Sequence, residues 1–245
     1  METVELICNP KKHTQLILPF REDKSEHADL ARKILNAAAC PVAVPNYRLT
    51  PNANKDPAYR HPIHTDDLLH FLQFIIGWKD PPCLFDASKL VLLGHSCSAH
   101  MISSIVLDSD HWPLLDSPPL RVLSAVKGII TSEGIFDIDD LLKSFPNYRD
   151  WFIEPTFGPL ESYKKFSVVN LPPRHPSLSV RWLLLHSKGD TLVDIGQTMA
   201  MYKYLTKLDS IHVELDTDSL VDEHNDILQA DEYVEIIKKF VHPLL

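Results

Sequence analysis

The stretch KLVLLGHSCSAHM, from Lys89 to Met101, contains a short apolar run that ends in a cluster of small residues. Four apolar residues lead into Gly94, and a helical pattern begins a few residues later. A buried strand that turns sharply into a helix would place Ser96 at the turn, with its hydroxyl above the carboxyl edge of a sheet. The stretch therefore predicts a strand, a tight turn and a helix that together present a serine.

The motif around this serine is GHSCS, a variant of the GxSxG pattern that is typical of serine nucleophiles at such turns. Ser98 occupies the position of the second glycine, which keeps that side chain small but adds some steric load. A five-residue pattern this loose also occurs by chance in plain strand-to-helix turns. The apolar run before it and the helix after it favour Ser96 as a nucleophile.

The rest of the chain alternates short apolar runs with longer segments of helical period, which predicts a mostly parallel sheet flanked by helices. We expect a single α/β domain over residues 1–245, with a small cap at about residues 138–178. The predicted strands cover residues 4–8, 15–20, 41–46, 89–94, 126–131, 181–186 and 211–215. The predicted helices cover residues 26–39, 65–77, 99–107, 138–144, 195–208 and 231–241.

Composition narrows the class of protein. The 245 residues are 44% hydrophobic and carry a net charge of −9, which argues against nucleic-acid binding. The four cysteines are scattered and the N-terminus lacks a signal-like pattern, so we expect a reduced, cytoplasmic setting. The apolar runs are far shorter than the roughly 20 residues that cross a bilayer, so we expect no membrane association.

A serine hydroxyl needs a histidine base, and the histidine needs a carboxylate to orient it. In this topology the chain order is serine, acid, histidine. Asp190, in LLLHSKGDTLVD, follows a predicted strand and is the candidate acid, with Asp194 as a second choice. His224, in DSLVDEHNDIL, lies between the last predicted strand and the last predicted helix, which makes it the candidate base among 13 histidines.

Other reactive side chains have simpler explanations. Cys97 follows the serine, but its offset turns the thiol away from the tip of the turn. His61 and His64 have a spacing that a metal can use, yet the sequence offers no third ligand nearby, so we expect no metal. The carboxylates from Glu133 to Asp140 are interpreted as helix-start and solvent-facing charges.

The chain contains, in this order, the stretches VPNYRLTP, HTDDLLHFL, LLGHSCSAHM, TSEGIFDIDDLLKSFPNY, HSKGDTLVDIGQT and EHNDIL. Together they resemble the kynurenine formamidases, also called arylformamidases, of the α/β-hydrolase superfamily, especially the fungal type. The resemblance covers nearly the whole chain from about Thr14. It implies an α/β-hydrolase fold with nucleophile Ser96, acid Asp190 and base His224, no cofactor, and N-formylkynurenine as substrate.

One departure from that family concerns the oxyanion hole. The family has an HGGxW motif after an early strand, whereas this chain has LILPFREDKSEHADLA and no glycine before Gly77. The Cys97 N–H remains as one donor, and Phe20 or Arg21 is the candidate source of a second. Loss of one such donor costs about 2.7 to 4 kcal/mol of transition-state stabilisation.

Three aromatic residues of the predicted cap, Tyr148, Trp151 and Phe152, are candidates for an aryl-binding wall, although packing explains them equally well. The leading hypothesis is a serine hydrolase that acts on a small-molecule aromatic amide or ester through an acyl-serine. A short-acyl carboxylesterase and a noncatalytic binding protein of the same fold are the alternatives. The sequence leaves open whether the protein forms a homodimer.

Overall fold

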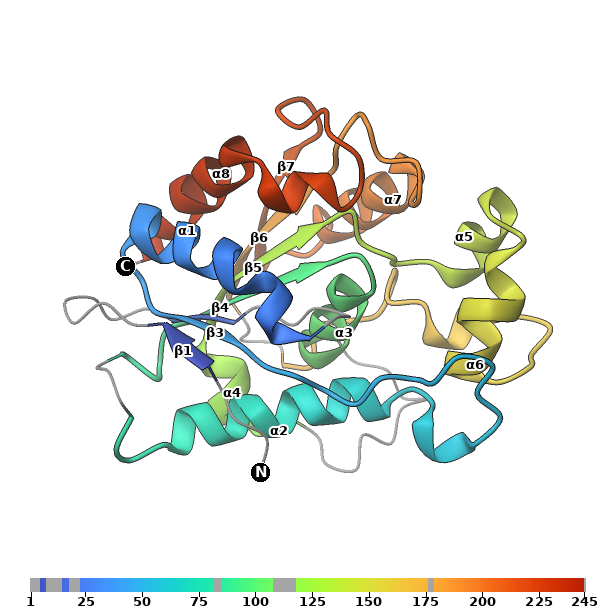
Figure 1. The fold of residues 1–245 in the computed structure, drawn as a ribbon, viewed down its shortest axis with the longest axis horizontal. Coiled ribbons are helices and arrows are strands. Elements are labelled where there is room, and N and C mark those ends of the chain that lie inside the picture. The colour runs from blue at the N-terminus through green and yellow to red at the C-terminus, as the bar shows by residue number, and fades with distance from the viewer. Residues whose placement is uncertain are drawn as a thin grey trace.

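A seven-stranded sheet forms the centre of the computed structural model, with the strand order β1-β3-β2-β4-β5-β6-β7 (Figure 1). Neighbouring strands are parallel except β1, which is antiparallel to β3. The strands are β1 (Glu5–Ile7), β2 (Gln15–Ile17), β3 (Val42–Val44), β4 (Leu90–His95), β5 (Val126–Ser132), β6 (Val180–Leu185) and β7 (Ile211–Asp216). The structure describes residues 5–7, 15–17, 23–81, 85–107, 118–175 and 179–244.

Each of the six predicted helices is present, with ends that differ by a few residues. Two short helices, α4 and α6, are not predicted by the sequence pattern. Pro119 directly precedes α4, and a proline is readily accommodated at the start of a helix. The helices are α1 (Ala28–Ala38), α2 (Ile63–Gly77), α3 (Cys97–Val106), α4 (Leu120–Ala125), α5 (Ile138–Ser144), α6 (Glu154–Phe157), α7 (Ile195–Leu205) and α8 (Asp231–Val241).

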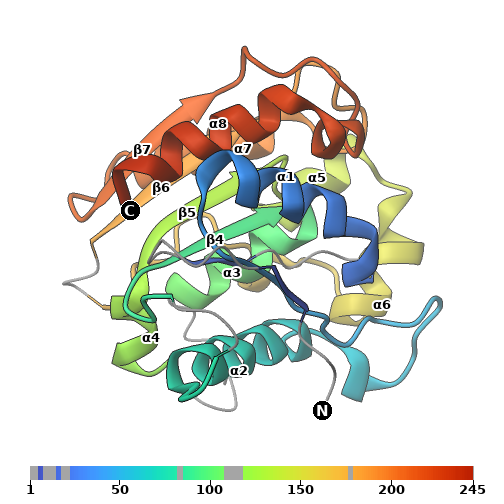
Figure 2. The same cartoon turned by 60° about the vertical axis from the view of Figure 1, so that its left-hand side comes forward.

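The helices cover both faces of the sheet. Figure 2 shows α1 and α8 over one face, and α2 and α3 over the other. Successive residues of β4 alternate between the two cores, with Leu90 and Leu92 packed among α2, α3, α4 and α7, and with Val91 and Leu93 packed among α1 and α8. Because both faces are buried, the strand is apolar at every position, as parallel strands usually are.

The predicted cap region lies beside the carboxyl edge of the sheet (Figure 1). It contains α5, a π-helical turn over Arg149–Ile153, and α6. Its buried side chains, which include Ile138, Ile153 and Tyr163, form a separate hydrophobic cluster. Val193, from the loop after β6, also belongs to this cluster and ties it to the main domain. That the region acts as a cap stays a prediction.

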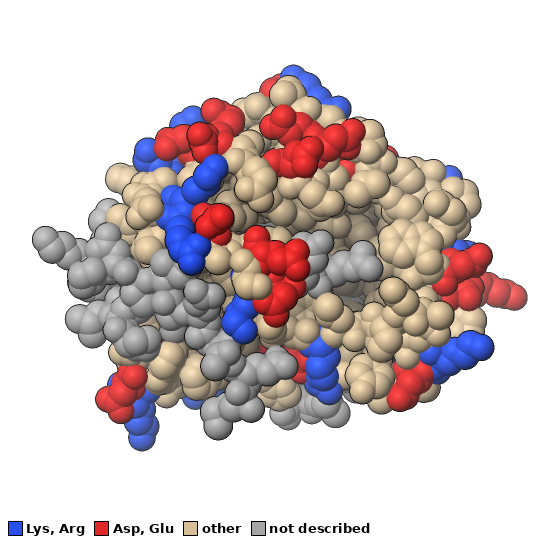
Figure 3. Space-filling model, in the orientation of Figure 1, with Lys and Arg blue, Asp and Glu red and all other residues tan. Residues whose placement is uncertain are grey.

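Two surface properties bear on partners. Basic and acidic side chains are interspersed over the face in Figure 3, rather than gathered in a basic stripe. Among the residues that the structure describes, no helix has the length and apolar character needed to cross a membrane.

Candidate active site

Ser96 lies at the sharp turn between β4 and α3. Its φ of 56° and ψ of −122° place it in a region that residues other than glycine rarely adopt. The Ser96 N–H donates to Ser132 O at 2.9 Å, which holds the turn against β5. Gly94 lets α3 pass closely, because a Cβ there would lie 2.7 Å from Ala99 N. The fold therefore holds Ser96 in a strained conformation at the edge of the sheet.

His224 and Asp190 come together from two loops at the same edge. Nδ1 of His224 lies 2.9 Å from Oδ2 of Asp190. The two loops touch at Gly189, where a Cβ would lie 2.2 Å from Val221 O. Glycine at this position therefore allows the loop after β6 to bring its carboxylate against the loop after β7.

The structure distinguishes the two candidate acids. Oδ1 of Asp190 accepts hydrogen bonds from the N–H groups of Leu192 and Val193 at 2.8 and 3.0 Å, which leaves Oδ2 for His224. Asp194 instead caps α7, because its Oδ1 accepts from the Gly196 N–H at 3.0 Å. Since Nδ1 of His224 donates to a carboxylate, Nε2 is the ring nitrogen that can accept a proton.

One cavity of about 410 Å³ contains both Ser96 and His224 in its lining. Tyr148, Trp151 and Phe152 line the same cavity. In the described part of the chain no hydrogen bond joins Ser96 to His224; this contact is often long in free enzymes and shortens when substrate binds. The structure thus brings the predicted nucleophile, base and aromatic residues around one space.

The aromatic residues form a continuous group on one side of this cavity. The Tyr148 and Trp151 ring centroids are 5.4 Å apart, and those of Trp151 and Phe152 are 5.6 Å apart. Phe145 stacks behind Tyr148 at 4.9 Å, and the Tyr148 hydroxyl donates to Leu192 O at 3.0 Å. Trp151 is 49% exposed, so its ring is accessible to a ligand.

Glu133 is a site residue that the sequence reasoning missed. Its interpretation as a helix-start or solvent-facing charge is wrong, because the residue is fully buried. Oε2 of Glu133 lies 3.1 Å from Nδ1 of His224, the same nitrogen that contacts Asp190. Glu133 directly follows β5, and β5 pairs with β4, the strand that ends just before Ser96. A residue that directly follows a parallel strand lies at the carboxyl edge of the sheet, and this position is the signal that could have identified Glu133.

The charges of this cluster determine its protonation. Burial alone lowers the pKa of His224, but interactions with Asp190 and Glu133 outweigh it and raise the pKa to about 9. Burial raises the pKa of Glu133 to about 6, and repulsion from Asp190 acts in the same direction. Burial, together with the charge of His224, lowers the pKa of His95. Of the two rings, His224 is therefore the one held as a cation at neutral pH.

His95 packs against the candidate base. The ring centroids of His95 and His224 are 4.5 Å apart. Nδ1 of His95 is 3.1 Å from Oγ of Ser132, which is 2.8 Å from the hydroxyl of Tyr233 on α8. These buried hydrogen bonds hold the His95 ring in place, and the His224 ring packs against it.

Three of these side chains have the composition of a metal site. His95, Glu133 and His224 each offer one ligand atom, and these atoms lie within 4.8 Å of one another. However, Nδ1 of His224 is the atom that bonds Asp190, and Nδ1 of His95 bonds Ser132. These contacts engage Nδ1 of both rings with protein groups, so we interpret the cluster as hydrogen-bonded and assign no metal to it.

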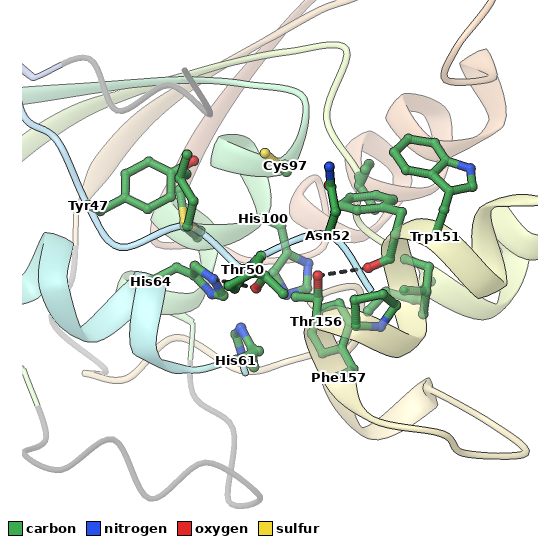
Figure 4. A pocket seen from close by; sticks show the side chains of 18 residues that line it. Tyr47, Thr50, Asn52, His61, His64, Cys97, His100, Trp151, Thr156 and Phe157 are labelled. Carbon is green, nitrogen blue, oxygen red and sulfur yellow. Dashed lines mark hydrogen bonds between the residues drawn. The ribbon is translucent and has the colours of Figure 1, made fainter. Parts of the chain in front are cut away.

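A second cavity, of about 210 Å³, adjoins the first and shares Cys97, Ile135, Trp151 and Phe152 with it (Figure 4). Its lining includes His61 and His64, at the start of α2, and His100 from α3. Nε2 of His64 is 2.9 Å from Oγ1 of Thr50, and the rings of His61 and His100 are 5.6 Å apart. Their surroundings are mostly apolar side chains.

The predicted oxyanion donors are only partly described. Cys97 is the first residue of α3 and directly follows Ser96. Phe20 and Arg21 lie outside the described residues. The strand before them, β2, pairs in parallel with β4, with Ile17 opposite Leu92. Strand β2 therefore ends toward the same edge of the sheet as β4, the edge where Ser96 lies.

Two curated fungal proteins are similar in sequence. The chain is 26% identical over 163 residues to a kynurenine formamidase of Meyerozyma guilliermondii, covering 65% of this chain and 57% of that protein. It is 26% identical over 194 residues to kynurenine formamidase avaC of Aspergillus versicolor, covering 69% and 63%. The chain thus spans about three fifths of the length of the curated relatives it matches. No protein-family model matches the chain.

Solved structures of esterases and related hydrolases share the fold. An acetyl ester-xyloside bifunctional hydrolase from Caldicellulosiruptor lactoaceticus has a TM-score of 0.69, with 16% identity, over 98% of this chain and 87% of that chain. A lipase/esterase from Lactobacillus plantarum has a TM-score of 0.70, with 12% identity, over 99% and 93%. At these identities the likeness shows the fold alone. The chain is thus similar in sequence to kynurenine formamidases and has the fold of α/β-hydrolase esterases.

Proposed function

We propose that the protein is a serine hydrolase that removes a small acyl group from an aryl amide, with N-formylkynurenine as the substrate and kynurenine and formate as products. Ser96 is the nucleophile, His224 the general base and Asp190 its carboxylate. The observation that carries the proposal is their convergence: a strained serine and an acid-bound histidine line one cavity beside three aromatic side chains.

In the first half of the reaction, Oγ of Ser96 attacks the formyl carbon while Nε2 of His224 takes the hydroxyl proton. The carbonyl oxygen becomes an oxyanion. When the tetrahedral intermediate collapses, the carbon–nitrogen bond breaks and His224 gives its proton to the departing arylamine. Asp190 stabilises the imidazolium that exists between these two transfers.

In the second half, water attacks the formyl-serine ester while His224 takes a proton from the water. Collapse of this intermediate releases formic acid, which ionises to formate, and returns the proton from His224 to Ser96. The cycle needs no cofactor, because every proton that His224 accepts is returned.

The oxyanion is stabilised by the Cys97 N–H at the start of α3 and by a donor from Phe20 or Arg21, which replaces the missing HGGxW motif. The parallel pairing of β2 with β4 supports this assignment, because β2 ends toward the edge of the sheet where Ser96 lies. The aryl group of the substrate rests on Tyr148, Trp151 and Phe152, and the formyl group, the smallest acyl group, occupies the space at Ser96.

A short-acyl carboxylesterase is the second candidate, and the second cavity favours it. That space of about 210 Å³ begins at Cys97, next to the nucleophile, and can hold an acyl group larger than formyl. The same triad would cleave an ester by the same steps, with an alcohol in place of the arylamine as leaving group.

The test compares N-formylkynurenine with p-nitrophenyl acetate, using wild type and Ser96→Ala. We expect faster turnover of the formamide than of the ester, and loss of both activities in the variant. Faster ester turnover, lost in Ser96→Ala, would assign the protein as a carboxylesterase. Equal background with both proteins, together with no labelling of wild type by a fluorophosphonate, would favour a noncatalytic binding protein.

A further inference from the structure

Nδ1 of His224 contacts two buried carboxylates, whereas the triad mechanism requires one. It lies 2.9 Å from Oδ2 of Asp190 and 3.1 Å from Oε2 of Glu133. Both carboxylate side chains are fully buried. One N–H can make one well-aligned hydrogen bond, and Asp190 accepts it, so Oε2 of Glu133 faces the same nitrogen as a charge contact without a hydrogen bond of its own.

The fold holds Glu133 in this position through its backbone and its second oxygen. Its φ of 51° lies in the left-handed region, and its N–H donates to Leu185 O at 2.9 Å. Oε1 accepts from the Ser187 N–H at 3.3 Å. The Ser187 hydroxyl donates to Asp222 O at 2.5 Å, two residues before His224. The carboxylate is therefore fixed to the loops that carry both the acid and the base.

A second buried carboxylate is costly unless it interacts with a positive charge. Two carboxylates beside one imidazole repel each other, and burial removes the water that would screen them. That cost is offset when the imidazole carries a proton, because each acid then faces a cation. The arrangement thus favours the imidazolium that forms during acyl transfer.

We propose that Glu133 is a second carboxylate partner of His224, which shares with Asp190 the task of orienting the imidazole and stabilising its positive charge. This inference rests on the proposed function. Glu133 acts through His224 and does not reach the substrate, so it is a positioning residue.

The proposal makes the pH dependence of the reaction specific. Tyr148 of the cap region lies near Asp190 and lines the cavity. Four further ionisable side chains besides Glu133 lie near His224 or its acid at the same edge of the sheet. They are Asp190 after β6, His95 at the end of β4, His186 whose Nε2 is 3.8 Å from Asp190 Oδ2, and His27 before α1, which lines the cavity.

The two carboxylates beside it raise the pKa of His224 to about 9. Since only the neutral ring accepts the serine proton, kcat/KM of wild type rises with pH up to that value. Glu133→Gln keeps the side-chain size but removes one negative charge. It is expected to move this midpoint down by about one pH unit or more. It also lowers the alkaline plateau of kcat by about tenfold, because His224 becomes a weaker base. KM stays within about twofold.

Two further variants test whether the acids share one task. Asp190→Asn leaves Glu133 beside Nδ1, so we expect a loss of only about 100-fold in kcat, whereas loss of the sole triad carboxylate costs about 10⁴-fold. The double variant Glu133→Gln/Asp190→Asn is expected to reach the full loss. Glu235→Gln, the same chemical change on the outer surface of α8, is the matched control and leaves the profile unchanged.

A measurement without substrate separates this inference from the proposed function. NMR titration of the His224 ring is expected to show a lower midpoint in Glu133→Gln than in wild type, and a smaller shift of the same sign in Glu133→Asp, which also serves if the glutamine variant does not fold. If the midpoint moves but no protein hydrolyses either substrate, the contact stands and the proposed activity fails. An unchanged His224 midpoint, with Asp190→Asn as slow as the double variant, would overturn the role of Glu133.

Discussion

The two cavities are separated by a wall that includes Cys97 and Phe152, which line both of them. The pKa values of the histidines on the two sides of this wall are shifted in opposite directions. On the side of the nucleophile, carboxylates raise the pKa of His224 to about 9 despite its burial. On the other side, burial lowers the pKa of both His64 and His100 to about 4. All three residues are at most 7% exposed, so burial does not distinguish them.

The difference shows that the groups in contact with a buried histidine, and not the extent of its burial, determine whether the ring is charged. His224 has two buried carboxylates within 3.1 Å of its Nδ1. His64 has a threonine hydroxyl, and its nearby Asp67 is engaged by Arg48 in an ion pair at 2.6 Å. His61 faces the rings of His100 and Phe157 (Figure 4). One cavity therefore contains a histidine held as a cation, and the other presents neutral rings.

The largest expected effect comes from the same substitution made on both sides of the wall. His224→Gln removes the proposed general base, and we expect kcat to fall by about 10⁴-fold or more. His64→Gln keeps a nitrogen donor for Thr50, and we expect kcat to change by less than about tenfold because the ring takes no part in proton transfer. Initial rates with N-formylkynurenine and p-nitrophenyl acetate measure both.

Equal losses in the two variants would contradict the division of roles between the cavities. A control for folding is the near-UV circular dichroism of each variant, which reports whether Trp182 and the other buried rings keep their packing. Fluorophosphonate labelling gives a second readout, and it is expected to slow in His224→Gln alone.

The features that the sequence could predict are local and periodic. Residues 90–93 are apolar at every position because both faces of β4 are covered, and this continuous run predicts a buried parallel strand. Gly94 and Ser96 occupy the turn that such a strand makes into a helix. Asp190 and His224 follow the ends of their strands, so topology alone places them at one edge. Ser98 is fully buried in the second glycine position, which the fold accommodates.

The features that the sequence could not predict depend on contacts between distant segments. Glu133 belongs to the acidic stretch SEGIFDIDD, in which Asp137 does cap a helix by accepting from the Asp140 N–H at 3.1 Å. The interpretation is right for Asp137 and wrong for Glu133, because the loops that bury Glu133 come more than 50 residues later. In the same way, the contact of His61 with His100 arises from the packing of α2 against α3.

A smaller effect concerns the free energy of unfolding as a function of pH. Burial lowers the pKa of His64 in the folded protein to about 4, against 6.5 when unfolded, so the unfolded state binds the proton more tightly. The stability that His64 contributes is complete above pH 6.5 and is lost as pH falls toward 4. Between pH 6.5 and 5 this linkage is worth about 2 kcal/mol. Urea unfolding of wild type and His64→Gln at pH 7 and pH 5 measures it.

On the nucleophile's side the sign is reversed. The raised pKa of His224 means that the folded state binds the proton more tightly, so its contribution is complete below pH 6.5 and is lost as pH rises toward 9. We therefore expect His64→Gln to flatten the stability profile on the acid side, and His224→Gln to flatten it on the alkaline side. Parallel profiles for the two variants would contradict the comparison.

The smallest expected effect concerns Thr50, whose hydroxyl is the partner of His64 in the second cavity, whereas the partners of His224 are carboxylates. The Thr50 hydroxyl donates to Tyr59 O at 2.8 Å, so its oxygen accepts from Nε2 of His64 at 2.9 Å. Thr50→Val removes both hydrogen bonds and leaves a buried N–H without an acceptor, which costs about 1 to 2 kcal/mol in the free energy of unfolding. Thr50→Ser retains the hydroxyl and is expected to recover most of that loss. Because His64 is neutral and lies on the far side of the wall, the kcat of Thr50→Val should match wild type, and a large fall in kcat would show that the two cavities are coupled.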